Sequence, residues 1–430
     1  MATALFYRVF YVVIITFFAV SIIILFMHKS AYAVDAATVL PKGIFRAWFL
    51  TAQSEIISQE INSDGKLENY GSRLNRSVTV DDLVLRDPRI GQLVNTLNTI
   101  EPGLGSKLMS ANLYSDMNLS TTAAITALEY GVNDRLSIGI NIPIFRRKVS
   151  ANFNAISVNN ATATGSHIGD ISPDLQNALY QFGIESFDRG MFVKSIFTAK
   201  GYDAPSSFDK TELGDVVFGG KYNFYKNEHF YSTALLGARA PTGSTPSLTN
   251  IYDKGCGSGS WGIAGALYEE YLPKKSISFV AMQKLSYAFS DTRERAVPKN
   301  QDDALPSLLA KDGQVQNVTR TQALSFDSEL SSTLRLLRDS ELSIWGAYQF
   351  SAKGKDQYSG PGDLYYAGLE NATDNISHNL EIGAGYSTIP AYRRKAFSVP
   401  GEIQLVYNSV IDGKNIPYMN YAYMNLMIYF

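Results

Sequence analysis

Apolar and polar residues alternate along most of this chain, and the alternation restricts the fold more than any other feature. From Leu136 to Phe145, aliphatic side chains occupy every second position, and mostly small or polar residues lie between them. From Leu324 to Leu336, one set of alternate positions is mostly aliphatic, and the other carries no apolar side chain. Successive side chains of a strand point to opposite faces, whereas a helix would mix the two sets. The pattern therefore predicts long strands with one apolar face.

The alternating segments come in pairs that are joined by very short polar turns. We expect hairpins at 118–131/135–145, 171–186/190–200, 214–226/229–241, 259–272/276–289, 321–337/341–354 and 378–389/401–412, and a last strand at 418–430. Longer segments rich in Gly, Ser, Asn and Pro separate one pair from the next. Short turns therefore alternate with long loops along the chain.

This alternation of loop lengths is typical of bacterial outer-membrane barrels, which have short periplasmic turns and long external loops. The expected strands suit a tilted crossing, which needs about 9–11 residues in the hydrocarbon, whereas strands of soluble proteins typically have about 5–6. Aromatic rings with polar groups favour the membrane interface. Such residues gather beside the expected short turns: Tyr130, Phe182, Phe187, Phe224, Tyr225, Phe230, Tyr231, Tyr268, Tyr271, Tyr386 and Tyr429. We predict an all-β fold, a transmembrane antiparallel up-and-down β-barrel.

The number of strands follows from the position of the chain ends. The pairs above and the last strand give thirteen strands, whereas a single-chain barrel of this kind has an even number. We therefore expect a first strand at about 43–57, although its alternation is poor, and predict about 14 strands, with 12 and 16 left open. The segment 58–110 then becomes the longest external loop. Asp87-Pro88 and the helical spacing of apolar residues from Ile90 to Ile100 predict a short helix in it.

The N-terminus carries one long apolar run. Arg8 precedes Val9 to Met27, and Ala31-Tyr32-Ala33 supplies small residues at the two positions that a signal peptidase requires. We predict a signal peptide over 1–33 with cleavage near Ala33, a short segment at 34–42 and a barrel over 43–430. An uncleaved signal anchor is the alternative, because the apolar run is longer than usual. The expected location is the outer membrane of a Gram-negative bacterium.

Composition excludes several other classes of protein. Charged residues make up 18% of the chain and the formal net charge is −2, so the basic surface of a nucleic-acid-binding protein is absent. Cys256 is the only cysteine, which excludes an internal disulfide, and the sequence contains no CxxC or HExxH spacing. We expect no cofactor and no metal. A barrel enzyme would need a proton-transfer residue at its rim, and His378 is the only candidate; we predict no enzymatic activity.

Charged residues on the strands are expected to face the lumen. An Arg or Lys facing lipid near the midplane would cost about 2–4 kcal/mol. The parity of the strands predicts these pore-lining residues: Asp215, Lys221, Asp327, Glu329, Arg335, Lys353, Glu381, Glu402 and Gln404. They either orient a polar or amphipathic solute or pair across the lumen and keep it hydrated.

Several short motifs resemble one family. The end of the chain, Tyr423 to Phe430, resembles the terminal strand by which outer-membrane proteins are recognised, which implies the barrel-assembly machinery as a partner. Over roughly 110–430 the chain is similar to outer-membrane channels named for the meta-pathway of phenol degradation, distant relatives of the fatty-acid and aromatic-hydrocarbon channels. The motifs that carry this resemblance are Leu128 to Gly139, Gly214-Asp215, Gly220-Lys221-Tyr222, and Ala240 to Gly243 followed by the glycine-rich Gly255 to Gly262.

The resemblance implies a function but departs from the family in one respect. Channels of the fatty-acid type carry an N-terminal hatch of some tens of residues, and here only about nine residues (Val34 to Lys42) precede the first expected strand. We therefore expect 58–110 to be the plug of the lumen. The predicted function is passive passage of a small, hydrophobic or aromatic solute across outer-membrane lipid and lipopolysaccharide. The alternative is a non-conducting surface or structural barrel, an adhesin or envelope anchor, acting through its external loops.

Overall fold

A computed structural model of the chain describes residues 37–72, 75–79, 88–105, 109–157, 173, 203, 206–250, 252–298, 315–337 and 341–430. The predicted signal peptide and its cleavage site lie outside these residues. Within them, no helix is both long enough and apolar enough to cross a membrane.

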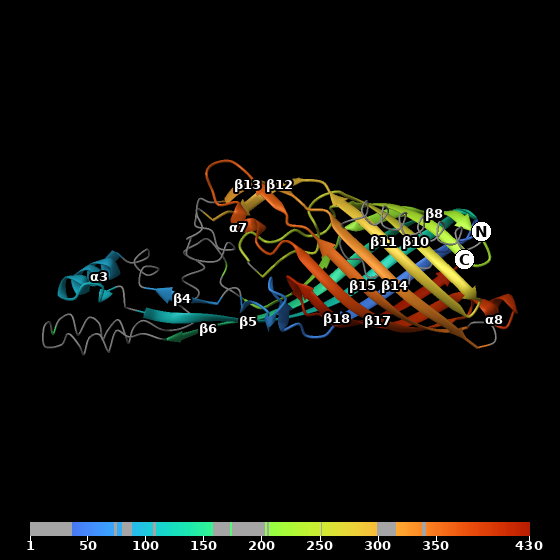
Figure 1. Cartoon of the computed structure of the whole chain (residues 1–430), viewed down its shortest axis with the longest axis horizontal. Coiled ribbons are helices and arrows are strands. Elements are labelled where there is room, and N and C mark those ends of the chain that lie inside the picture. The colour runs from blue at the N-terminus through green and yellow to red at the C-terminus, as the bar shows by residue number, and fades with distance from the viewer. Residues whose placement is uncertain are drawn as a thin grey trace, which may run out of the picture.

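Twelve antiparallel strands form a closed barrel (Figure 1). Because β5 pairs with both β1 and β6, and β1 pairs with β20, the first and last parts of the chain join and close the sheet. The barrel strands are β1 (Phe45–Ser54), β5 (Met109–Asn133), β6 (Leu136–Ser157), β8 (Val216–Lys226), β9 (Phe230–Ala240), β10 (Gly262–Lys274), β11 (Ile277–Ala288), β14 (Ser325–Leu336), β15 (Leu342–Lys353), β17 (Asn375–Ser387), β18 (Gly401–Lys414) and β20 (Tyr421–Tyr429). The predicted all-β antiparallel barrel is confirmed.

The preferred number of 14 strands is wrong, and the structure has the lower number in the predicted range. Strand β6 pairs directly with β8, from Leu136 opposite Tyr222 to Asn141 opposite Val217. Both edges of β6 are therefore occupied within the barrel, by β5 and β8, so no further hairpin fits between them. The hairpin expected at 171–186/190–200 lies outside the described residues. The five other hairpins, the first strand and the last strand are confirmed.

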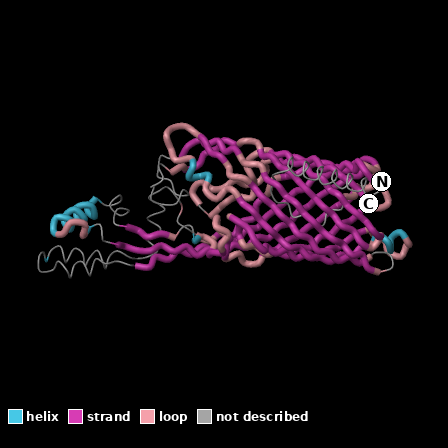
Figure 2. The backbone as a smooth tube through the Cα atoms, in the orientation of Figure 1, coloured by secondary structure: helices cyan, strands magenta, loops and turns pink. Residues whose placement is uncertain are grey.

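Strands β5 and β6 are much longer than the others, with 25 and 22 residues. They continue beyond the barrel as a two-stranded extension (Figure 2). The short strand β4 (Arg76–Thr79) pairs with β5, and β7 (Phe208–Leu213) pairs with β6. The predicted helix is confirmed as α3 (Pro88–Ile100), in which Leu97 is buried. It lies beyond the barrel (Figure 1), so this part of the segment 58–110 does not plug the lumen as expected.

The two ends of the barrel differ. At one end, called the loop end, two small sheets stand outside the barrel wall. One consists of β12 (Asp291–Ala296), β13 (Val315–Thr321) and β16 (Gln357–Ser359), and the other of β19 (Ile416–Pro417), β2 (Gln59–Ile61) and β3 (Leu67–Asn69). The short helix α7 (Ala367–Glu370) lies beside the first sheet. The other end, called the turn end, has short turns and the helix α8 (Ile389–Arg393).

The alternation divides each strand between an outer apolar face and an inner face. Leu236 on β9 is 71% exposed, whereas Thr233, three positions earlier and of opposite parity, is fully buried. Four of the nine expected aromatic residues that the structure describes are exposed, namely Phe224, Tyr225, Tyr271 and Tyr386. Tyr268, in contrast, has 1% exposure, because its parity directs the side chain into the lumen. Nearness to a turn alone therefore did not identify the exposed rings.

Candidate functional site

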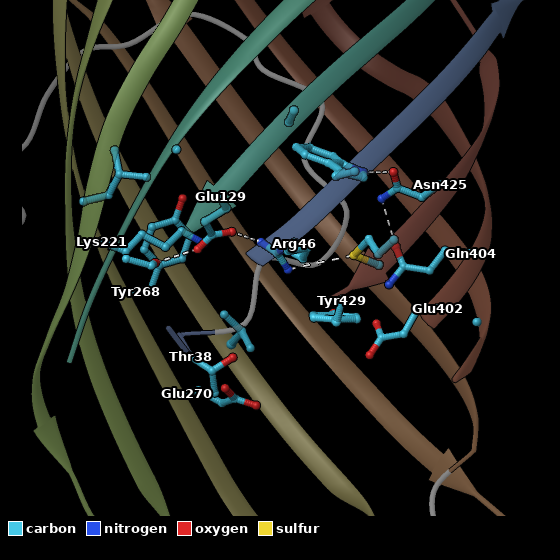
Figure 3. A pocket seen from close by; sticks show the side chains of 18 of the residues that line it. Thr38, Arg46, Glu129, Lys221, Tyr268, Glu270, Glu402, Gln404, Asn425 and Tyr429 are labelled. Carbon is cyan, nitrogen blue, oxygen red and sulfur yellow. Dashed lines mark hydrogen bonds and ion pairs between the residues drawn. The ribbon is translucent and has the colours of Figure 1, made fainter. Parts of the chain in front are cut away.

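The lumen contains a cavity of about 560 Å³ toward the turn end of the barrel. Its walls combine aromatic, acidic and basic side chains that project inward from different strands (Figure 3). Prominent among them are Arg46, Trp48, Glu129, Lys221, Tyr268, Glu270, Arg335, Trp345, Glu402, Gln404 and Tyr429. A cavity of this size is in the range of small-molecule sites, about 300–1,000 Å³.

The charges that line this cavity are paired. Arg46 on β1 forms an ion pair with Glu129 on β5, and Ser137 Oγ donates to the same carboxylate at 2.5 Å. Arg335 lies 3.6 Å from the buried Glu270. The Lys221 ammonium lies 5.0 Å from the centre of the Tyr268 ring, a distance at which the ring attracts the cation. The cavity is therefore polar but contains little unbalanced charge.

Residues just before β1 fold back into the turn end of the lumen. Thr233 Oγ1 donates a hydrogen bond to the carbonyl oxygen of Ala37, and Asn223 Nδ2 lies 3.4 Å from that oxygen. Ala37 is fully buried and packs against Ala266 and Tyr268. Thr38 lines the cavity (Figure 3). Among the described residues, this short segment, not 58–110, narrows the lumen at this end. No sequence pattern predicted this position, because the segment is too short to show a period.

A second group of polar residues lies deeper in the barrel, around Glu381 on β17. This side chain is 1% exposed. Its oxygens accept hydrogen bonds from Trp345 Nε1 at 3.3 Å and from Tyr423 Oη at 3.2 Å. Gln349 Nε2 donates to both Glu381 (3.2 Å) and Glu329 (3.1 Å), and Asn408 Nδ2 lies 3.4 Å from Glu381. In the described part of the chain, neutral donors rather than cations surround Glu381.

An apolar cluster borders this network on the lumen side. The cluster consists of Leu50 on β1, Trp345 on β15, Val406 on β18 and Tyr423 on β20. Strands β1 and β15 are separated by three strands in the sheet. A cluster that includes side chains from both strands therefore reaches across part of the lumen at this level.

The predicted pore-lining residues fall into three groups. Lys221, Arg335, Glu402 and Gln404 line the cavity. Asp327, Glu329 and Glu381 are buried on the inner face, where Lys284 Nζ lies 3.1 Å from Asp327. Lys353 forms an ion pair of 2.6 Å with Asp356 near the loop end. Their part in conduction remains a prediction.

Asp215, the last of the predicted pore-lining residues, is buried at the loop end, where Arg239 Nε lies 3.6 Å from its carboxylate. It lies at the break between β7 and β8, where its carboxylate accepts hydrogen bonds from the backbone amides of Gly243 (3.0 Å) and Ser258 (2.7 Å). A Cβ on Gly257 would lie 2.6 Å from the backbone of Gly243, so the glycines permit a close contact between two loop segments. Three motifs that resemble the channel family thus meet around one carboxylate at the loop end.

His378, the candidate proton-transfer residue, lies among aromatic side chains. His378 Nδ1 lies 2.5 Å from Tyr348 Oη, and the His378 ring lies 5.1 Å from that of Phe350. Its partners are therefore aromatic residues rather than a nucleophile or an acid. Among the described residues, no three His, Cys, Asp or Glu side chains come together in a way that could hold a metal ion.

Comparison with known proteins supports the fold. No family model matches the chain, and no curated protein matches it. The solved structures include an outer membrane channel from Pseudomonas putida F1, which has 12% identity and a TM-score of 0.52 and aligns over 93% of this chain and 100% of that one.

Two further structures are the monoaromatic hydrocarbon channel CymD (9% identity, TM-score 0.30, 94% of both chains) and the Pseudomonas putida toluene transporter TodX (9% identity, TM-score 0.33, 92% of both chains). These two scores are too low to support an argument. The first comparison confirms, at the level of the fold, the predicted relation of this chain to outer-membrane channels.

Proposed function

We propose that the protein is an outer-membrane channel through which a small solute passes down its concentration gradient. The observation that carries this proposal is the cavity of about 560 Å³ inside a closed barrel whose outer face is apolar. Twelve strands lie between the eight of a filled barrel and the sixteen to eighteen of an open porin. A narrow, selective path is therefore favoured over a wide aqueous pore.

The lining of the cavity favours an amphipathic solute with an aromatic or hydrophobic part. Trp48, Tyr268 and Trp345 offer apolar ring surfaces, while Arg46, Glu129 and Arg335 offer polar groups. Rings with a polar partner nearby bind small aromatic molecules by stacking and by edge contacts. The proposed driving force is the concentration gradient of the solute alone.

The assembled protein would span outer-membrane lipid below lipopolysaccharide. The last residue, Phe430, exchanges backbone hydrogen bonds with Phe45 (2.8 and 3.0 Å) and stacks on its ring, with 5.7 Å between ring centres. Its side chain remains exposed. The final strand thus closes the barrel and still presents the terminal aromatic ring at the surface, as recognition by the barrel-assembly machinery would require.

The test uses the purified protein in planar bilayers and in liposomes. We expect single-channel conductance, and faster entry of small aromatic solutes into liposomes that contain the protein. A matched variant that lacks residues 37–41 should conduct more, because this segment occupies the turn end of the lumen. If neither the complete protein nor this variant conducts or takes up solute, the channel proposal is wrong.

The alternative, a non-conducting surface or structural barrel, has one observation in its favour. The extension formed by β5 and β6 carries α3 well beyond the barrel (Figure 1), and a channel wall does not need such a projection. A variant shortened within this extension separates the two functions. Unchanged conductance with lost cell-surface binding would support a surface role beside the channel.

A further inference from the structure

Four arginines gather at the loop end of the barrel. Three of them belong to the small sheet formed by β12, β13 and β16. Arg293 and Arg295 alternate with exposed residues on β12, and Arg320 on β13 stands opposite Asp291 on β12. Asp291, Arg293, Arg295 and Arg320 therefore share the less exposed face of this sheet. The fourth, Arg239, ends the inner face of β9, since its parity is opposite to that of the exposed Leu236.

The arginines outnumber the carboxylates around them. Asp291 is the ion-pair partner of all three sheet arginines, at 3.5 Å from Arg293 Nε, 2.7 Å from Arg295 Nη2 and 2.7 Å from Arg320 Nε. Arg239 Nε lies 3.6 Å from Asp215, whose carboxylate already accepts two backbone amides. The four guanidinium groups and two carboxylates therefore leave an excess of two positive charges.

Several of these guanidinium nitrogens are buried without an acceptor. Within the described part of the chain, Arg239 Nε, Arg293 Nη1 and Arg295 Nε are inaccessible to water and have no hydrogen-bond partner. The side chains of Arg293, Arg295 and Arg320 are only 13–20% exposed. Burial, together with repulsion from Arg295 and Arg320, lowers the pKa of Arg293 to about 10. Buried donors and uncompensated charge are both costly, and an oxyanion would relieve both.

The cluster borders the lumen rather than the lipid. Arg320 Nη2 donates to the carbonyl oxygen of Ser258, in the glycine-rich loop that leads into β10. Gly259 in the same loop leaves room for Arg293, whose Nη1 would lie 3.0 Å from a Cβ at that position. Leu235 and Gly237, on the same face of β9 as Arg239, line the lumen cavity. The arginines therefore stand at the outer entrance of the path that leads to the cavity.

We infer that Arg239, Arg293, Arg295 and Arg320 form an entry site for the carboxylate of a small organic anion. This inference rests on the proposed channel function and specifies its solute class. The planar guanidinium group matches a carboxylate with two parallel hydrogen bonds. Arg295 lies 5.3 Å from the centre of the Tyr358 ring, which helps to hold its plane fixed. An aromatic carboxylate would bind here by its charged end before it passes on toward the cavity.

Binding is tested on the whole protein in detergent, where no conduction is needed. Isothermal titration with benzoate, inorganic phosphate and neutral benzyl alcohol compares the protein with R293Q/R295Q. The matched control is R146Q, which removes an exposed arginine near the loop end that pairs with Asp209. We expect saturable benzoate binding that weakens at least tenfold in R293Q/R295Q and stays within twofold in R146Q. The single variant R293Q, which should weaken binding several-fold, serves if the double variant does not fold.

Several results would overturn the site: no saturable benzoate binding, equal benzoate affinity in R293Q/R295Q and the unaltered protein, or tighter binding of phosphate or benzyl alcohol than of benzoate. Tighter phosphate binding would indicate a lipid headgroup as the source of the anion. Bilayer recordings with potassium benzoate keep the two proposals apart. Binding without conductance would retain the site and refute the channel, whereas conductance without benzoate binding would retain the channel and refute the site.

Discussion

The arginine cluster at the loop end and the Glu381 network inside the barrel have charge imbalances of opposite sign. At the loop end, three guanidinium groups converge on the single carboxylate of Asp291. Inside the barrel, Glu381 is surrounded by an indole, a phenol and two amides and has no cation beside it in the described part of the chain. The first cluster still has unused donors, whereas the second brings several donors to one carboxylate.

This difference indicates separate roles for the two regions. A buried carboxylate with several hydrogen bonds is fixed in place and contributes to the order of the wall. A group of buried cations with unused hydrogen-bond donors is energetically costly, and a bound anion would reduce that cost. The network around Glu381 is therefore suited to shaping the lumen, and the arginine cluster is suited to attracting a solute. The following predictions test that division.

Removal of Asp291 should have the largest effect. In Asp291→Asn, Arg293, Arg295 and Arg320 lose their common carboxylate and repel one another. We expect the small sheet to lose roughly 3 kcal/mol of local stability, seen as about 100-fold faster amide hydrogen exchange in β12 and β13. Added benzoate should restore part of the protection, because it supplies the missing anion.

The barrel strand β20 is the internal control, and its exchange should not change in Asp291→Asn. Unaltered exchange in β12 and β13 would mean that the three arginines do not depend on Asp291. The contrast between the two regions would then fail.

Truncation of Glu381 should have the next largest effect, without any response to anions. Glu381→Ala leaves Trp345 Nε1, Asn408 Nδ2 and Tyr423 Oη with one acceptor fewer inside the barrel. We expect a loss of about 2 kcal/mol in the free energy of unfolding, measured by guanidinium titration in lipid vesicles. Glu381→Gln keeps one oxygen acceptor and should lose less than half as much. Equal losses in the two variants would show that the packing of the side chain, not its hydrogen bonds, matters here.

The sequence predicted those parts of this arrangement that depend on local pattern. Alternation along β14 and β17 assigns Glu329 and Glu381 to the inner face without knowledge of the neighbouring strands. Turn composition likewise identified five of the hairpins. The number of strands could not be found in this way, because it depends on the pairing of β6 with β8, which lie far apart in the chain.

The arginine cluster and the segment at Ala37 escaped prediction for related reasons. Arg293 and Arg295 alternate with Thr292 and Glu294 as in a strand, but the sequence does not reveal that Arg320 joins them across β12 and β13. Ala37 lies in a segment without period, and its burial depends on contacts with β9 and β10. The hydrogen bonds of Asp215 to Gly243 and Ser258 also escaped prediction, because they join loop segments that lie apart in the chain.

A third experiment concerns the turn end, which neither charged region controls. Thr233→Val removes the hydroxyl that donates to Ala37 O while preserving the shape of the side chain. We expect a loss of about 1 kcal/mol in the docking of residues 37–41. A cysteine introduced by Thr38→Cys in a Cys256→Ser background should then react about fivefold faster with a water-soluble maleimide.

Ser232→Ala, on the neighbouring position of β9, is the control for Thr233→Val. If maleimide reacts at the same rate with and without Thr233→Val, the hydrogen bond does not hold the segment in the lumen.

The smallest expected effect concerns a second charged cluster at the loop end, in which two carboxylates meet two cations. Its balanced charge contrasts with the excess of positive charge in the arginine cluster. Asp253 lies 2.8 Å from Arg147 and 2.5 Å from Lys210. Burial alone would raise the pKa of Asp253, but the hydrogen bonds from Lys210 and Arg147 lower it below its usual value. The pKa of Glu212, which also pairs with Arg147, is lowered in the same way against the effect of burial.

A carboxyl group whose pKa is lower in the folded state stabilises the fold above its unfolded pKa, here about 4 for both residues. That contribution disappears as the pH falls through the lowered folded value. The midpoint of thermal unfolding, followed by near-ultraviolet circular dichroism, should therefore drop between pH 5 and pH 2. Asp253→Asn should reduce this drop, and Asp253→Asn with Glu212→Gln should reduce it further, while the lowered pKa values of Asp209 and Asp374 account for part of what is left. An unchanged drop in the double variant would place the acid sensitivity elsewhere, whereas a smaller drop would show that the carboxylates of this cluster are stabilised by the cations beside them.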